Sequence, residues 1–87
     1  MINKTLKYRD FLRVFDLVAT KGTKSSSVYD FLGIQAQHDF DGYTCWLTYK
    51  DLTVTLLFHG KFEVEFDNKD TFGEFYKKAN AMIALNE

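Results

Sequence analysis

The densest group of side chains able to do chemistry is His38-Asp39-Phe40-Asp41-Gly42. Two carboxylates spaced by two residues, with an imidazole beside them, can ligate a divalent cation. The same residue types also form ordinary turns, because Asp side chains bond nearby backbone and Gly tolerates positive φ. We expect a turn here, and a metal site at His38, Asp39 and Asp41 is the alternative.

The remaining candidates for catalysis lack partners. Cys45 lies in an apolar alternating run, where burial disfavours the thiolate. His59 could act as a base with Glu63 or Glu65 nearby on the next strand, but no third group to orient it is identifiable, and a surface histidine at the edge of a loop is the simpler interpretation. The five glycines are at least nine residues apart, so no phosphate-binding loop is present. We therefore predict that the chain is not an enzyme and uses no cofactor.

Size and charge restrict the class of protein. The 87 residues suffice for a single domain over 1–87. A net charge of −1 gives no general attraction for nucleic acid or an anionic membrane. Residues 1–24 hold six basic and two acidic residues, net +4, and the remainder is net −5. This asymmetry could steer a protein partner, including a second copy, although mutual solvation of two faces of one small domain is the simpler explanation.

Sequence features also suggest a compartment. The single cysteine cannot form an internal disulfide, and the N-terminus lacks the apolar core of a signal peptide. No apolar run is long enough to cross a bilayer. We expect a cytoplasmic protein.

Residues 5–20 have the apolar spacing of an amphipathic helix, with a stripe of Tyr8, Phe11, Phe15 and Val18. Leu6 and Leu17 fall on the other side, so they are expected at the surface. Gly22 is expected to end the helix in a left-handed conformation.

The segment from Val28 to Ala36 predicts the least regular strand. Val28, Leu32, Ile34 and Ala36 share one face with Asp30, while Tyr29 and Phe31 take the other. The strand is expected to be buried on both sides or to contain a bulge.

The clearest pattern is a hairpin with a two-residue turn at Lys50-Asp51. This turn places apolar residues opposite apolar residues throughout, and a slip of one would bring threonines into the core. The predicted pairs are Tyr49 with Leu52, Leu47 with Val54, Cys45 with Leu56, and Tyr43 with Phe58.

A further strand and a helix complete the pattern. A three-residue loop, His59–Lys61, leads to Phe62, Val64 and Phe66 on the buried face. Thr71 and Glu74 fit a capping box at the start of a helix. The apolar stripe of this helix is Phe72, Phe75, Tyr76, Ala79, Met82 and Ile83.

These elements predict a two-layer α+β fold: helix, four-stranded antiparallel meander, helix, with both helices on one sheet face. The other face would then carry a candidate interaction surface of Thr44, Trp46, Thr48, Thr53 and Thr55. Trp is an enriched anchor in protein interfaces, and the adjacent charges are acidic, which argues against nucleic acid. The alternative is that the threonines are simply good strand formers, with Trp46 tucked under a loop or beside Tyr29 and Phe31.

Residues 39–44 (DFDGYT), followed by residues 56–59 (LLFH), resemble a small gammaproteobacterial family of unknown function. The resemblance spans most of the chain and implies no activity, ligand or catalytic residue. We therefore expect a small cytoplasmic accessory domain that binds a protein. The alternative is a small-molecule or metal-binding protein, using a pocket between helix and sheet or the His38, Asp39 and Asp41 turn.

Overall fold

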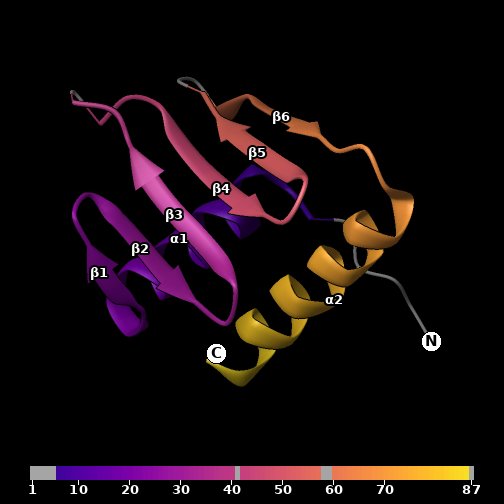
Figure 1. Ribbon diagram of the computed structural model, residues 1–87. Helices are drawn as coiled ribbons and strands as arrows, with labels where there is room; N and C mark the ends of the chain where they lie inside the picture. The colour runs from indigo at the N-terminus through magenta and orange to yellow at the C-terminus, as the bar shows by residue number, and fades with distance from the viewer. Residues whose placement is uncertain (1–5, 41, 58–59, 87) are drawn as a thin grey trace.

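The computed structural model describes residues 6–40, 42–57 and 60–86, which form two helices and a six-stranded antiparallel sheet (Figure 1). The strands follow one another in the sheet in chain order, so the sheet is a simple meander. The elements are α1 (Tyr8–Lys21), β1 (Thr23–Ser25), β2 (Val28–Phe31), β3 (Ile34–His38), β4 (Cys45–Tyr49), β5 (Leu52–Leu56), β6 (Phe62–Glu65) and α2 (Lys69–Leu85). The α+β class is confirmed, and the prediction of four strands is wrong.

The additional strands arise from two tight turns. Leu32 and Gly33 both have positive φ, 55° and 85°, and they separate β2 from β3. Phe31 then faces Ile34 across the turn, and Tyr29 faces Ala36. Tyr29 and Phe31 consequently share the core face with Ile34 and Ala36, contrary to the predicted division of this segment.

The short strand β1 was not expected at all. Ser25 pairs with Val28, and Ser26, with φ 57°, begins the two-residue turn between them. Every residue of β1 is exposed. Nothing in its apolar pattern could therefore have identified it as a strand.

The hairpin of β4 and β5 has the predicted register. Tyr49 pairs with Leu52, Leu47 with Val54, and Cys45 with Leu56. Lys50 supplies the positive φ, 53°, that closes the turn. Tyr43 lies before the strand and is 63% exposed, so its predicted burial is wrong. Its predicted partner, Phe58, lies outside the described residues.

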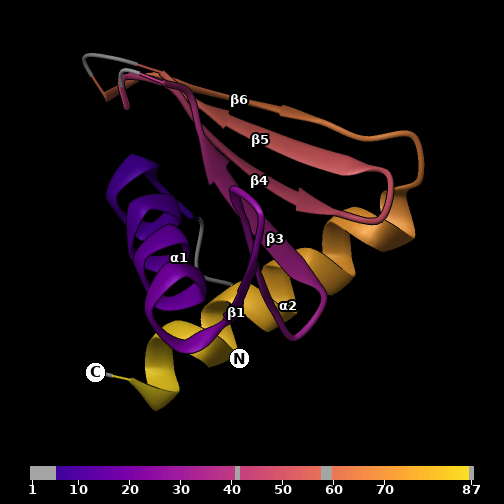
Figure 2. The same ribbon diagram turned by 60° about the vertical axis from the view of Figure 1, so that its left-hand side comes forward.

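Both helices pack on the same face of the sheet (Figure 2). The ring of Phe11 in α1 lies 4.9 Å from that of Phe62 in β6, and the ring of Phe75 in α2 lies 6.2 Å from that of Tyr49 in β4. Phe11 and Phe75 are themselves 6.4 Å apart. The core therefore lies between this face and the two helices.

The position of α1 explains why its buried surface is wider than one stripe. The helix contacts α2 as well as the sheet. Leu17 is consequently only 7% exposed. Leu6, which precedes the helix, is 2% exposed, so the expectation that both leucines lie at the surface is wrong. Gly22 has φ −84°, so it ends the helix without a left-handed conformation.

The second helix begins two residues before the predicted cap. The side chain of Asn68 accepts a hydrogen bond from the backbone N–H of Asp70 and caps the helix. Thr71 lies inside the helix and is buried. The predicted apolar stripe does face the core, because Phe75, Ala79, Met82 and Ile83 are all buried.

Candidate functional site

The sheet face opposite the helices is not covered by any helix or strand among the described residues (Figure 2). One row of residues on this face runs across all six strands, because each residue in it is paired with the next one in the neighbouring strand. The row consists of Thr23, Asp30, Gln35, Thr48, Thr53 and Glu65. It contains no apolar residue, as expected for a face in contact with water.

A second row contains the tryptophan. Trp46 pairs with Gln37 on one side and Thr55 on the other, and Thr55 pairs with Glu63. We call the residues around this position the Trp46 face: Gln35, Gln37, Trp46, Thr48, Thr53, Thr55, Glu63 and Glu65. Tyr29 and Phe31 lie on the opposite side of the sheet, so Trp46 is not tucked beside them.

Four of the five predicted surface residues come together on this face. Trp46, Thr48, Thr53 and Thr55 are half-buried although no described helix or strand lies over them, because neighbouring side chains on the sheet shield one another. Thr44 belongs to the preceding loop instead. Its backbone N–H donates to the Asp39 carboxylate over 3.3 Å.

The Trp46 face is acidic. Glu63 and Glu65 point to this side of β6, and Asp30 points to the same side of β2. Lys24, the one Lys or Arg in the described strands, pairs with Tyr29 and lies over its ring on the core side, 5.5 Å from the ring centroid. The face therefore offers hydrogen-bonding groups and negative charge around one large aromatic side chain.

The basic first helix is less accessible as a contact surface. Arg13 donates a hydrogen bond to the backbone oxygen of Asn86 over 2.8 Å. One of the cationic side chains of α1 therefore already binds the C-terminal end of α2. Arg9 and Lys21 remain exposed.

The predicted turn at residues 38–42 is organised by Asp39. Its backbone carbonyl accepts from the N–H of Gly42, and its carboxylate accepts from Thr44. A ring nitrogen of His38 lies 2.8 Å from the Asp39 carbonyl oxygen. Within the described ranges, no three His, Cys, Asp or Glu side chains are grouped as metal ligands would be. Asp41 and His59 lie outside those ranges, so the alternative of a metal site at this turn and that of a base at His59 are not tested.

Cys45 is half-buried and packs against the core. Burial raises the pKa of its thiol, and the nearby Asp39 carboxylate raises it further. The neutral thiol is therefore the form present at physiological pH. This state agrees with a packing role and opposes a role as nucleophile.

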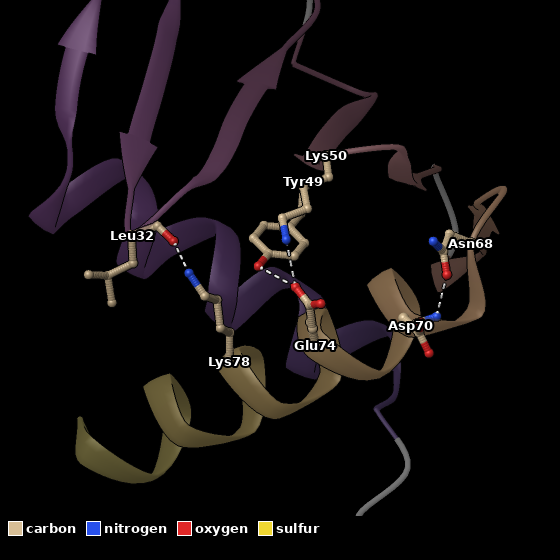
Figure 3. Close-up of polar contacts among 7 residues, drawn as sticks. All are labelled: Leu32, Tyr49, Lys50, Asn68, Asp70, Glu74 and Lys78. Atoms are coloured by element: carbon tan, nitrogen blue, oxygen red, sulfur yellow. Dashed lines mark hydrogen bonds and ion pairs between the residues drawn. The ribbon is translucent and has the colours of Figure 1, made fainter.

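One polar cluster was not predicted from the sequence (Figure 3). Tyr49 and Lys50 both donate to Oε1 of Glu74, over 3.1 and 2.8 Å. The hydrogen bond from Lys50 to Glu74 lowers the pKa of the Glu74 carboxyl and raises the pKa of the Lys50 ammonium. Lys78 lies 5.1 Å from the Tyr49 ring centroid and donates to the carbonyl of Leu32. These contacts join two turns of the sheet to α2.

The cluster has a structural role, because its hydrogen bonds hold α2 against the sheet. Tyr49 and Lys50 donate to the same Glu74 carboxylate, and Lys78 donates to the backbone oxygen of Leu32. No sequence signal could have revealed it, because Glu74 lies 24 residues from Lys50 along the chain.

Comparison with known proteins places the chain in a family. No curated protein and no solved structure matches it. Neither of the two described helices is long and apolar enough to cross a membrane. A family model described as "Protein of unknown function (DUF3081)" matches residues 6–87. This match confirms the resemblance to a small family of unknown function, and the gammaproteobacterial source stays a prediction. The chain belongs to the DUF3081 family.

Proposed function

We propose that this chain is a small cytoplasmic domain that binds another protein through the Trp46 face. The observation that supports the proposal is a broad sheet face that no described helix or strand covers, while both helices pack on the other side. Trp46 lies among threonines and glutamines on this face. The proposed role is binding and not catalysis.

The chemistry of the face indicates the kind of partner. A Trp side chain supplies a large contact area, and hydroxyl and amide groups around it can form the polar rim of an interface. The acidic border of Glu63 and Glu65 favours a partner with basic residues around its contact surface. A nucleic acid is disfavoured, since its phosphates would meet carboxylates.

The test is affinity capture with matched variants. Trp46→Ala removes the anchor, while Leu85→Ala removes an 84% exposed apolar side chain on α2, away from the sheet. We expect wild type and Leu85→Ala to recover the same partner, and Trp46→Ala to lose it while keeping its circular dichroism spectrum. Sedimentation velocity of all three proteins tests a second copy as the partner. A strict monomer with identical captured proteins in all three samples would refute the proposal.

A further inference from the structure

Strand β6 forms one edge of the sheet. It pairs with β5, and no described strand lies along its other side (Figures 1 and 2). An edge strand leaves every second residue with unpaired backbone groups, and proteins bind extended peptides by adding a strand at such an edge.

The register shows which backbone groups are unpaired. The N–H of Leu57 donates to the carbonyl of Lys61 over 2.8 Å, so these two residues form a hydrogen-bonded position of the antiparallel ladder. Such positions alternate along an antiparallel pair. Glu63 and Glu65 therefore bond to β5, and the N–H and C=O groups of Phe62 and Val64 point to the open edge.

The side chains along this edge form two rows of different character. Phe62 and Phe66, each 37% exposed, and the half-buried Val64 lie on the core side of the sheet. Their exposure departs from the predicted burial because no strand of the described ranges lies beyond β6. Glu63 and Glu65 form an acidic row on the opposite side. An added strand would meet apolar groups on one face and carboxylates on the other.

We propose that β6 binds an extended segment of another protein in which basic and apolar residues alternate. The apolar side chains of this segment pack beside Phe62, Val64 and Phe66, and its basic side chains lie beside Glu63 and Glu65. This site shares Glu63 and Glu65 with the Trp46 face but does not use Trp46 itself, so it does not depend on the anchoring role proposed for that residue.

A second copy of the chain fits the edge poorly. Antiparallel pairing of two β6 strands around a twofold axis places the acidic row of one beside the acidic row of the other, and like charges in cross-strand pairs are destabilising. The opposite edge of the sheet, β1, has only three residues, Thr23, Lys24 and Ser25, and lacks the apolar row. The charge pattern therefore favours a basic heterologous segment at β6.

The binding test uses a fluorescent ten-residue peptide of alternating lysine and valine, with a glutamate–valine peptide as its charge-reversed control. We expect the lysine–valine peptide to bind wild type and to bind Glu63→Lys/Glu65→Lys about tenfold more weakly. The glutamate–valine peptide should show the reverse preference. Trp46→Ala should bind the lysine–valine peptide as wild type does, which separates this site from the Trp46 anchor. Equal binding of the lysine–valine peptide to wild type and the double variant would overturn the proposal.

Amide hydrogen exchange locates the bound peptide. The amides of Phe62 and Val64 should exchange faster than those of Glu63 and Glu65 in the free protein, and should become protected when the lysine–valine peptide is added. Val64→Pro removes an amide that points to the open edge, whereas Glu63→Pro removes one that bonds to β5. We expect Val64→Pro to fold and to lose peptide binding, and Glu63→Pro to lose stability. Should Val64→Pro fail to fold, exchange in the wild type decides: unchanged exchange at Phe62 and Val64 with saturating peptide contradicts the proposal.

Discussion

Gly22, at the end of α1, lies directly against the backbone of Asp30 in β2. A β-carbon at position 22 would be 2.5 Å from the carbonyl oxygen of Asp30 and 2.4 Å from that of Val18. Both distances are far below van der Waals contact, and both neighbours are backbone atoms that cannot rotate away. The close approach of helix and strand therefore requires glycine here.

Gly22→Ala should destabilise the protein by about 2 kcal/mol or more, because the backbone of α1 or β2 must shift to accommodate the methyl group. Urea unfolding followed by circular dichroism measures the loss. A variant as stable as wild type would show that α1 and β2 are not in such close contact.

Gly73→Ala is the matched substitution, and we expect the opposite sign. Gly73 lies within α2, and nothing lies within 4 Å of the position that its β-carbon would take. Alanine in a helix is favoured over glycine by about 0.5–1 kcal/mol, so the midpoint of urea unfolding should rise. A decrease would indicate an unseen contact at this position.

Asp51 should make stability depend on pH in the acid range. A hydrogen bond from the Thr71 hydroxyl, together with those from the backbone N–H groups of Asn68 and Asp67, lowers the pKa of Asp51 from 3.8 to about 2. Because the pKa of Asp51 is lower in the folded state, Asp51 contributes its full stabilisation at pH values above its pKa in the unfolded chain. This stabilisation is lost as the pH falls through about 2.

Asp51→Asn should therefore be less stable than wild type at pH 7 and should lose less stability between pH 4 and pH 2. Urea unfolding across this range measures both effects. Asp16→Asn, at an exposed acid on α1, is the charge-matched control and should keep the wild-type stability at pH 7. Parallel profiles for wild type and Asp51→Asn would contradict the assigned hydrogen bonds.

Phe75 joins the aromatic core. It is fully buried, and its ring lies within 6.5 Å of those of Phe11, Tyr49 and Tyr76. Phe75→Ala leaves a cavity between the two helices and the sheet, and should cost about 3–5 kcal/mol in unfolding free energy. Phe40→Ala, at a fully exposed ring, should change stability by less than about 0.5 kcal/mol. Similar effects of the two substitutions would argue against this core.

Cys45 should react slowly with thiol reagents at neutral pH. Burial and the Asp39 carboxylate raise its thiol pKa, so the reactive thiolate is scarce in the folded protein. The rate of iodoacetamide alkylation should be lower in the folded protein than in the urea-unfolded chain at pH 8. Equal rates would show that the thiol is not shielded.

The sequence alone determined the local patterns that have one consistent solution. The register of the β4–β5 hairpin follows from alternation on both sides of Lys50 and Asp51, because any shift by one residue would bury threonines. The stripe of α2 follows from its apolar spacing in the same way. These features together predicted the mixed α+β class and the side of the sheet that carries Trp46.

Tertiary structure decided what depends on contacts between distant segments. Leu17 is buried in a helix that contacts α2 as well as the sheet, and no helical period encodes a second neighbour. The turn at Leu32 has a left-handed conformation that leucine rarely adopts, and Lys78 of α2 binds the carbonyl of Leu32. The unpaired edge at Phe62 and Val64 exists only because β6 is the last strand of the sheet, and the order of strands is a property of the assembled fold.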